Sequence, residues 1–221
     1  NKGMSYATGD ILAWLNADDV YFPWTLKKVS IFFNSYPNQE WISGSTSVMS
    51  EDGIINGLNG NIISKPTEYV KNGWFRSELY GYLQQEGMFW TKALWKKSGG
   101  LNEDYKLAAD FELWTRFAKF SELVSFGLPL ACFRKRDSSR SSMLKKDYEN
   151  EVSRICKKLI KMNFIKSFTA SYNLVSNILF RKLSFSKGLI YYFSLSQKKW
   201  FLKRKYSSIS THSWSRLFFL K

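Results

Sequence analysis

The first stretch that could do chemistry is "LNADDVYFPW", residues 15–24, where an apolar run ends in polar side chains. Asn16, Asp18 and Asp19 supply one amide and two carboxylates close together. A hard cation such as Mg²⁺ or Mn²⁺ prefers oxygen ligands and often takes one or two carboxylates together with phosphate oxygens. The cluster therefore predicts a metal that the protein shares with a diphosphate. A helix cap or turn near Pro23 is the competing interpretation.

A second candidate group lies in "LQQEGMFWTKALWKKSGGLNEDYKLAADFELWTRFAK", residues 83–119. Asp110 stands at the start of a predicted helix. There a carboxylate is either favoured by the helix dipole or placed to act as a general base. Glu112 is a weaker candidate for the base because it lies on another side of the same helix, on a face expected to be solvated.

Other side chains in the two stretches could contact a ligand. Gln85 and Glu86 either touch a substrate or make structural hydrogen bonds. Trp90 either stacks on a sugar ring or belongs to the core, as most tryptophans do. Arg134 and Arg136, in "FRKRDSSRSS", either pair with phosphate or belong to a solvated basic loop.

Apolar spacing indicates the elements that must position these groups. A short, fully buried strand of parallel type is expected over residues 10–15, followed by a helix from Pro23 with Leu26, Val29 and Phe33 on one face. The expected order then is strand 41–50, turn 51–53, loop 56–61, helix 66–73, irregular segment 84–91, helix 92–98, helix 109–119 and strand 124–133. This mixed order predicts an α/β sheet with helices packed on it.

The two groups together resemble a family-2 glycosyltransferase of the GT-A fold over about residues 1–140. In the first motif, which leads into the metal-binding D-x-D sequence, the matching residues are Asn1, Gly3, Ala7, Gly9, Asn16, Asp18 and Asp19. The chain departs from the motif at its first acid, where Asn16 stands. In the second, the matching residues are Gln84, Gln85, Glu86, Gly99, Gly100, Leu101, Asn102, Glu103, Asp110, Leu113, Trp114 and Arg116.

The resemblance implies an inverting, metal-dependent transfer of a sugar from a nucleotide-diphosphate sugar to the hydroxyl group of a glycan or lipid-linked acceptor. The product would be a bacterial cell-surface polysaccharide or glycolipid. The implied roles are general base for Asp110; Mg²⁺ or Mn²⁺ ligands for Asp18 and Asp19; donor diphosphate contacts for Asn16, Asp18, Arg134 and Arg136; and acceptor contacts for Gln85, Glu86 and Trp90. Relatives often carry Arg-x-His where Arg134 and Arg136 stand.

The family pattern also bears on the extent of the chain. Residues 1–142 correspond to the C-terminal part of a GT-A domain, whereas family members carry a nucleotide-holding unit before the metal motif. The chain is therefore expected to be a fragment or a truncated sequence that binds nucleotide sugar weakly by itself. The competing function is an inactive truncated transferase, or a non-catalytic basic module that binds membrane or nucleic acid.

The charge of the chain, +15 overall, is concentrated near its C-terminus. Residues 1–150 hold 18 Lys/Arg and 17 Asp/Glu, whereas residues 151–221 hold 15 Lys/Arg, 14 aromatic residues and one acid, Glu151. Residues 143–221 are expected to form a helical, basic extension, with a long amphipathic helix over 144–163 and further helices over 164–206. Its candidate partners are an anionic membrane surface, which we favour, and nucleic acid, which we favour least. A solvated helical cover for the catalytic part is the third interpretation.

Several classes of site are excluded or disfavoured. His212 is the only histidine, so a His-based triad or a multi-histidine zinc site is not available. Cys132 and Cys156 match no ligand spacing and are expected to be buried thiols in a reducing compartment. The expected location is the cytoplasm, at the inner face of the cell membrane.

Overall fold

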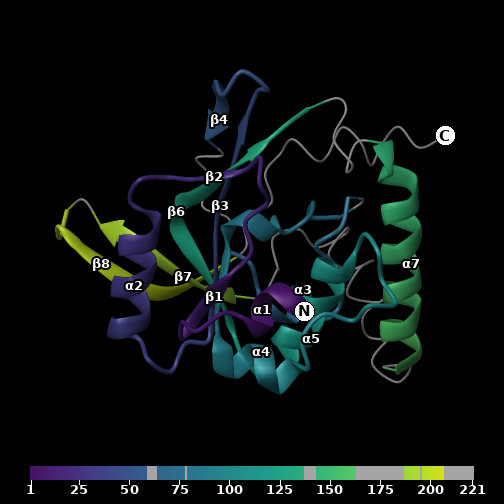
Figure 1. Cartoon of the computed structure of the whole chain (residues 1–221). Coiled ribbons are helices and arrows are strands. Elements are labelled where there is room, and N and C mark those ends of the chain that lie inside the picture. Colours follow the sequence, from purple (N-terminus) through teal and green to yellow (C-terminus); the bar gives the residue numbers. More distant parts are fainter. Residues whose placement is uncertain (59–63, 78, 137–142, 163–186, 195, 207–221) are drawn as a thin grey trace.

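The computed structural model describes residues 1–58, 64–77, 79–136, 143–162, 187–194 and 196–206, and in this part a mixed sheet of eight strands forms the centre (Figure 1). The strands are β1 Ile11–Ala13, β2 Val20–Tyr21, β3 Trp41–Met49, β4 Ile55–Leu58, β5 Met88–Thr91, β6 Leu123–Arg134, β7 Lys187–Ser194 and β8 Lys199–Tyr206. Their order is β1-β5-β3-β6-β7-β8, while β2 pairs with β6 and β4 pairs with β3. β6 runs parallel to β3 and β7, and the other pairs are antiparallel.

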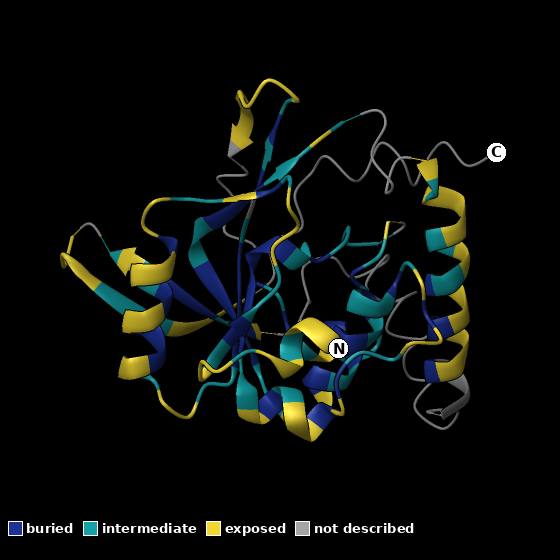
Figure 2. Cartoon of the chain, viewed as in Figure 1, coloured by how far each residue is buried: buried dark blue, intermediate teal, exposed yellow. Residues whose placement is uncertain are grey.

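Helices cover both faces of the sheet. They are α1 Lys2–Ser5, α2 Thr25–Ser35, α3 Thr67–Lys71, α4 Lys92–Ser98, α5 Ala109–Phe120 and α7 Lys145–Met162, with a 3-10 turn, η1 Gln85–Gly87. Successive residues of a strand point to opposite faces, so Trp41 packs against α3, α4 and α5 while Ile42 packs against α2. The buried side chains accordingly form one apolar cluster on each side of the sheet. Figure 2 shows buried residues, in dark blue, concentrated in the central strands.

Helix α7 adds an outer layer beyond α5 (Figure 1). Val152, Ile155, Cys156 and Leu159 line its buried side and pack with Phe111 of α5. Its opposite side is exposed (Figure 2). The amphipathic helix predicted for residues 144–163 is therefore confirmed over Lys145–Met162.

The long central strand β6 changes partners along its length. Its first half pairs with β7, and its second half pairs with β2. Its pairing with β3 shifts register around Ser45, opposite Pro129. Gly127 is needed beside this irregularity because a Cβ there would lie 2.7 Å from the carbonyl oxygen of Tyr191 in β7.

Most of the expected elements of the first 136 residues are present, with four differences. β1 is three residues long with only Leu12 buried, and it is an antiparallel edge strand rather than a fully buried parallel one. Leu26 is exposed, because α2 turns Val29, Phe32 and Phe33 inward. Residues 56–58 belong to β4, and residues 88–91 form the regular strand β5.

The prediction of further helices over residues 164–206 is wrong for residues 187–206, which form the hairpin β7–β8 and continue the sheet. Residues 163–186 lie outside the described part, as do residues 59–63 and 137–142. The boundary predicted at 142/143 stays a prediction. Within the described residues, no helix is both long and apolar enough to cross a membrane.

Candidate active site

A cavity of about 690 Å³ brings the two sequence motifs together. Asn16 and Asp18 reach it from the loop after β1, Gln85 and Glu86 from η1, and Asp110 from the first turn of α5. The remaining lining residues are Trp14, Tyr82, Leu83, Gln84, Lys106, Leu107, Ala109, Phe133, Leu144, Lys145, Tyr148 and Glu149. Five of the predicted site residues, from distant parts of the chain, therefore line the same cavity.

Asp18 is the partly exposed acid of the first motif. Its carboxylate pairs with the guanidinium of Arg136, and this contact holds the pKa of Asp18 below its usual value. The backbone carbonyl of Asp18 accepts a hydrogen bond from Nε of Arg134 at 3.0 Å. Both arginines predicted to contact phosphate thus lie beside Asp18, although neither lines the cavity.

Asp19 has a different role from Asp18. It is buried, with 5% of its surface exposed, and it does not line the cavity. Its Oδ1 accepts a hydrogen bond from the backbone N–H of Arg134 at 2.9 Å, and its Oδ2 accepts one from Nδ2 of Asn16 at 3.1 Å. Asp19 thus ties the loop after β1 to the end of β6, so the structure does not support the expectation that it shares a metal with Asp18.

The fit of the site to a divalent cation depends on Asp18 and Asn16. Among the described residues, no group of three or more His, Cys, Asp or Glu could hold a metal by itself. One carboxylate and one amide at a cavity wall still suit a hard cation that takes its other ligands from a diphosphate and water. The residues present therefore fit a shared metal but not an all-protein metal site.

Asp110 lies where α5 meets the cavity, and hydrogen bonds from α7 fix the loop before it. The carboxylate of Glu151 in α7 accepts hydrogen bonds from the backbone N–H groups of Lys106, Leu107 and Ala108 at 3.0, 3.0 and 2.9 Å. Burial raises the pKa of Asp110 to about 6, even though nearby backbone N–H groups act in the opposite direction. A carboxylate with this pKa is mostly ionised at neutral pH and is a better base than an ordinary aspartate.

Glu86 is the other perturbed carboxyl of the cavity. Only 4% of its surface is exposed, and burial raises its pKa to about 8, with smaller contributions from the charges of Asp19 and Asp110. Lys65 lies near enough to oppose this shift, and its Nζ donates to Oγ of Ser43 at 2.6 Å. At neutral pH Glu86 is thus mainly a neutral acid, while Asp110 is mainly a carboxylate.

Gln85 and Trp90 differ in their suitability for a ligand. Gln85 lines the cavity, and its Nε2 donates a 2.6 Å hydrogen bond to the carbonyl of Trp14, so its amide fixes the end of β1. Trp90 has no exposed surface and packs between Trp95, Trp114 and Phe117. The expectation that Trp90 stacks on a sugar is therefore wrong, because its side chain is fully buried in the core.

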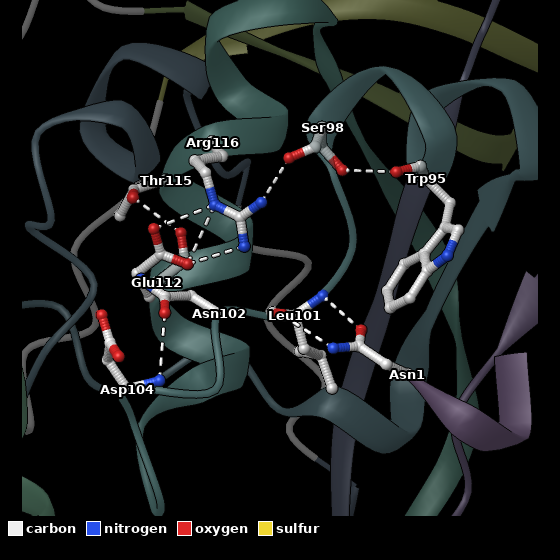
Figure 3. A network of polar contacts seen from close by, with 9 residues as sticks. All are labelled: Asn1, Trp95, Ser98, Leu101, Asn102, Asp104, Glu112, Thr115 and Arg116. Carbon is white, nitrogen blue, oxygen red and sulfur yellow. Dashed lines mark hydrogen bonds and ion pairs between the residues drawn. The ribbon is translucent and has the colours of Figure 1, made fainter.

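Three further residues of the second motif, Leu101, Asn102 and Arg116, belong to a network of polar contacts (Figure 3). Arg116 donates from Nε and Nη2 to the carboxylate of Glu112 at 2.7–2.9 Å, and from Nη1 to the carbonyl of Ser98. The expectation of a solvated face at Glu112 is thus wrong, because this ion pair is mostly buried. The side-chain amide of Asn1 donates to the carbonyl of Leu101 at 3.0 Å and accepts from the backbone N–H of Leu101 at 2.8 Å. These bonds join the start of the first motif to the second.

Comparisons with known proteins add little to this geometry. No family model matches the chain, and no curated protein matches it in sequence. A similar solved structure is that of residues 1–349 of TarS from S. aureus, with 13% sequence identity and a TM-score of 0.49. The similarity covers 72% of this chain and 43% of that one, so the chain spans less than half of it. This likeness does not assign the chain to a family.

Several cavity residues carry no signal in the sequence that marks them as part of a site. Gln84 was part of a motif but was not assigned to the site, although it directly precedes Gln85. Leu144 lies directly before α7, and Lys145, Tyr148 and Glu149 come from its first turns. Amphipathic spacing predicts this helix, but nothing in its spacing says which part of the fold its N-terminal end faces.

Proposed function

We propose that the chain forms the acceptor side of an inverting glycosyltransferase, which transfers a sugar from a nucleotide-diphosphate donor to a hydroxyl group in cell-surface polysaccharide or glycolipid synthesis. The observation that carries the proposal is the shared cavity of Asn16, Asp18 and Asp110, which come from two motifs about 90 residues apart. The shifted pKa of Asp110 supports the same assignment, since perturbed carboxyls in a cavity are typical of catalytic sites.

In the proposed reaction, Asp110 is the general base. The acceptor oxygen forms a bond to the anomeric carbon while the bond from that carbon to the diphosphate oxygen breaks. The diphosphate leaves with the electron pair, and the acceptor proton passes to the carboxylate of Asp110. Glu86 cannot compete for this proton at neutral pH because it already carries one.

The groups around Asp18 would serve the departing diphosphate. Asp18 and Asn16 would hold Mg²⁺ or Mn²⁺, and such an ion, when bound, neutralises charge that develops on the leaving group. Arg134 and Arg136 supply positive charge beside the same acid. Because Arg136 already pairs with Asp18, a diphosphate or a metal must compete with this ion pair.

The test of this function is the turnover of a panel of nucleotide sugars, both by the chain alone and by the chain fused behind a nucleotide-binding half of the family type. We expect Asp110→Asn to lower kcat of the fusion about 100-fold or more, while Asp147→Asn on the exposed side of α7 leaves it unchanged. Full turnover by Asp110→Asn would refute the role of the base. A fusion that binds nucleotide sugars but turns none over would favour the inactive transferase.

We also propose that the hairpin β7–β8 binds an anionic membrane surface on the cytoplasmic side. Residues 187–206 contain five lysines and one arginine but no acid. Lys199, Lys203 and Lys205 are exposed on the face that carries Tyr192 and Phe201. Cations interleaved with aromatic side chains suit the headgroup region of an anionic bilayer, where each lysine near the surface contributes about 1 kcal/mol.

Vesicle flotation tests this surface with point variants, since truncation would remove two strands of the sheet. We expect Lys199→Glu/Lys203→Glu to weaken binding to phosphatidylglycerol-containing vesicles at least about tenfold. Lys146→Glu/Lys157→Glu, which makes the same charge change on the exposed side of α7, should have a much smaller effect. Equal losses in both variants would refute a specific role of the hairpin, and tighter binding of the chain to single-stranded DNA than to these vesicles would favour the nucleic-acid alternative.

A further inference from the structure

One charged group that the proposed mechanism does not use lies against the central strand β3. It is the side chain of Lys65, whose Nζ donates to Oγ of Ser43 at 2.6 Å and to the carbonyl of Gly44 at 2.8 Å. Burial lowers the pKa of Lys65 to about 8, so the group is still mostly an ammonium ion at neutral pH. Lysine side chains rarely lie in such a place unless a specific partner holds them there.

The backbone of Lys65 is fixed by contacts on both sides. Oγ of Ser64 accepts from the backbone N–H of Gly188 in β7 at 3.1 Å and donates to the carbonyl of Lys205 in β8 at 2.9 Å. The backbone N–H of Lys65 donates to Oγ of Ser125 in β6 at 2.8 Å. A Cβ at Gly188 would lie 2.5 Å from Oγ of Ser64, so β7 has room for this segment because a glycine stands there. The ammonium group therefore extends from a well-defined position.

Gly44 lies at an interruption in the pairing of β3. The register with β5 ends at Ser43, opposite Met88, and the register with β6 passes from Ser43 to Ser45 without Gly44. The carbonyl of Gly44 accepts from Nζ of Lys65 instead, and from Oγ of Ser43 at a longer 3.4 Å. Since a buried carbonyl without a donor is unfavourable, the ammonium group stabilises β3 at the place where strand pairing does not.

The same glycine supports η1. Gly87, the last residue of η1, lies with its backbone against that of Gly44: a Cβ at Gly87 would be 3.7–3.9 Å from the nitrogen, oxygen and Cα of Gly44. Gln85 and Glu86, the other two residues of η1, line the cavity. A displacement of β3 at Gly44 would therefore move η1 and, with it, two side chains of the cavity wall.

We propose that Lys65 is a positioning residue for the cavity, because its ammonium group holds β3 at Gly44 and thereby keeps η1 and its side chains in place. In this role Lys65 contacts no substrate and acts through the backbone that it holds. The effect on turnover rests on the proposed function, but the position of η1 can be measured in the chain by itself. Small displacements of groups in a catalytic cavity can lower the rate strongly, so a fixed charged donor below η1 suits this role.

Amide hydrogen exchange, followed by NMR in the 221-residue chain, tests the proposal. Lys65→Met keeps most of the length of the side chain but removes the ammonium group. We expect the amides of residues 86–88 to exchange at least about tenfold faster relative to those of α2. The control is Thr67→Val, which removes the acceptor for the backbone N–H of Leu123 from the same segment and should affect both regions equally or not at all. Equal acceleration of both regions in Lys65→Met would overturn the proposal.

A milder pair of variants covers the case in which Lys65→Met does not fold. Ser43→Ala removes one of the two acceptors of the ammonium group and should accelerate exchange at residues 86–88 about threefold relative to α2. Ser47→Ala is the matched control, because Ser47 is equally buried in β3 but its Oγ has no partner within the described residues. The same local acceleration in Ser47→Ala, or none in Ser43→Ala, would count against Lys65 and overturn the proposal.

The pKa of Glu86 reports the charge of Lys65 directly. The ammonium group lowers this pKa, so ¹³C NMR titration should give a value above about 8 in Lys65→Met and no change in Ser47→Ala. An unchanged pKa in Lys65→Met would place the ammonium group too far from η1 and would also overturn the proposal.

Turnover of the fusion separates this inference from the proposed function. Lys65→Met should lower kcat/KM about tenfold or more. An active fusion whose kcat/KM is unchanged in Lys65→Met would sink this inference while the proposed function stands. Local acceleration of exchange at residues 86–88, together with a wild-type fusion that turns over no nucleotide sugar, would sink the proposed function alone.

Discussion

The substitution Glu86→Gln should remove a large pH dependence from the stability of the fold. The pKa of Glu86 is raised from 4.5 to about 8 by burial, so the folded chain keeps a proton that the unfolded chain releases. A raised pKa of this kind gives stability that is complete below pH 4.5 and is lost as pH rises toward 8. Between pH 5 and pH 7, the loss from this carboxyl alone is about 2.5 kcal/mol.

Urea unfolding of the wild-type chain and Glu86→Gln at pH 5 and pH 7 measures this linkage. Asp110 titrates in the same range and with the same sign, but it is present in both proteins, so its contribution cancels to first order. The wild-type chain should lose about 2.5 kcal/mol more unfolding free energy than the variant between the two pH values. A difference below about 0.5 kcal/mol would show that Glu86 is ionised in the folded state, and it would refute the reasoning about a neutral acid in the cavity.

Three further outcomes are expected. Turnover of the active fusion should fall as pH is lowered through about 6, where Asp110 gains its proton, and pH profiles of kcat measure this. Glu151→Gln should lower the unfolding free energy in urea by about 1–3 kcal/mol at pH 7, because both carboxylate oxygens accept from backbone N–H groups and the amide keeps only one acceptor oxygen. The lowered pKa of Glu151 means that this difference should shrink as pH falls through the ordinary carboxyl range, and an undiminished difference at pH 3 would contradict it. Trp90→Ala should cost about 3–5 kcal/mol in the same assay, and a loss below about 1 kcal/mol would show that Trp90 is not a core residue.

The sequence predicts correctly those helices and strands whose ends and faces are defined by residues close together in the chain. Gly99 ends α4 in the left-handed conformation, and the apolar residues Leu113, Trp114 and Phe117 all face the core from α5. The strand β3 and the helix α7 were predicted within a few residues of their actual ends for the same reason. Periodicity and end signals depend on neighbours in the chain, so one sequence is sufficient to find them.

The errors concern contacts between distant parts of the chain. Residues 187–206 carry aromatic and basic side chains that fit a helix by composition, but a free edge of β6 makes them a hairpin. The two adjacent acids of the first motif also look equivalent in the sequence. The end of β6 and the residues after it make the difference. The backbone N–H of Arg134 holds Asp19 in a buried position, whereas the guanidinium of Arg136 pairs with Asp18, which lines the cavity.

Two parts of the cavity wall differ in how far their residues can be changed without disturbing the fold. Asn16, Gln85 and Glu86 lie in segments that also tie β1, β3 and β6 together, so changes there disturb the sheet. The opposite wall is the first part of α7, where Lys145 and Glu149 line the cavity without belonging to a buried cluster. Substitutions at these two positions can change the shape of the cavity while the fold and the carboxyl groups of Glu86 and Asp110 remain. The size and charge of the ligand that the cavity admits can therefore change through substitutions on a single helix.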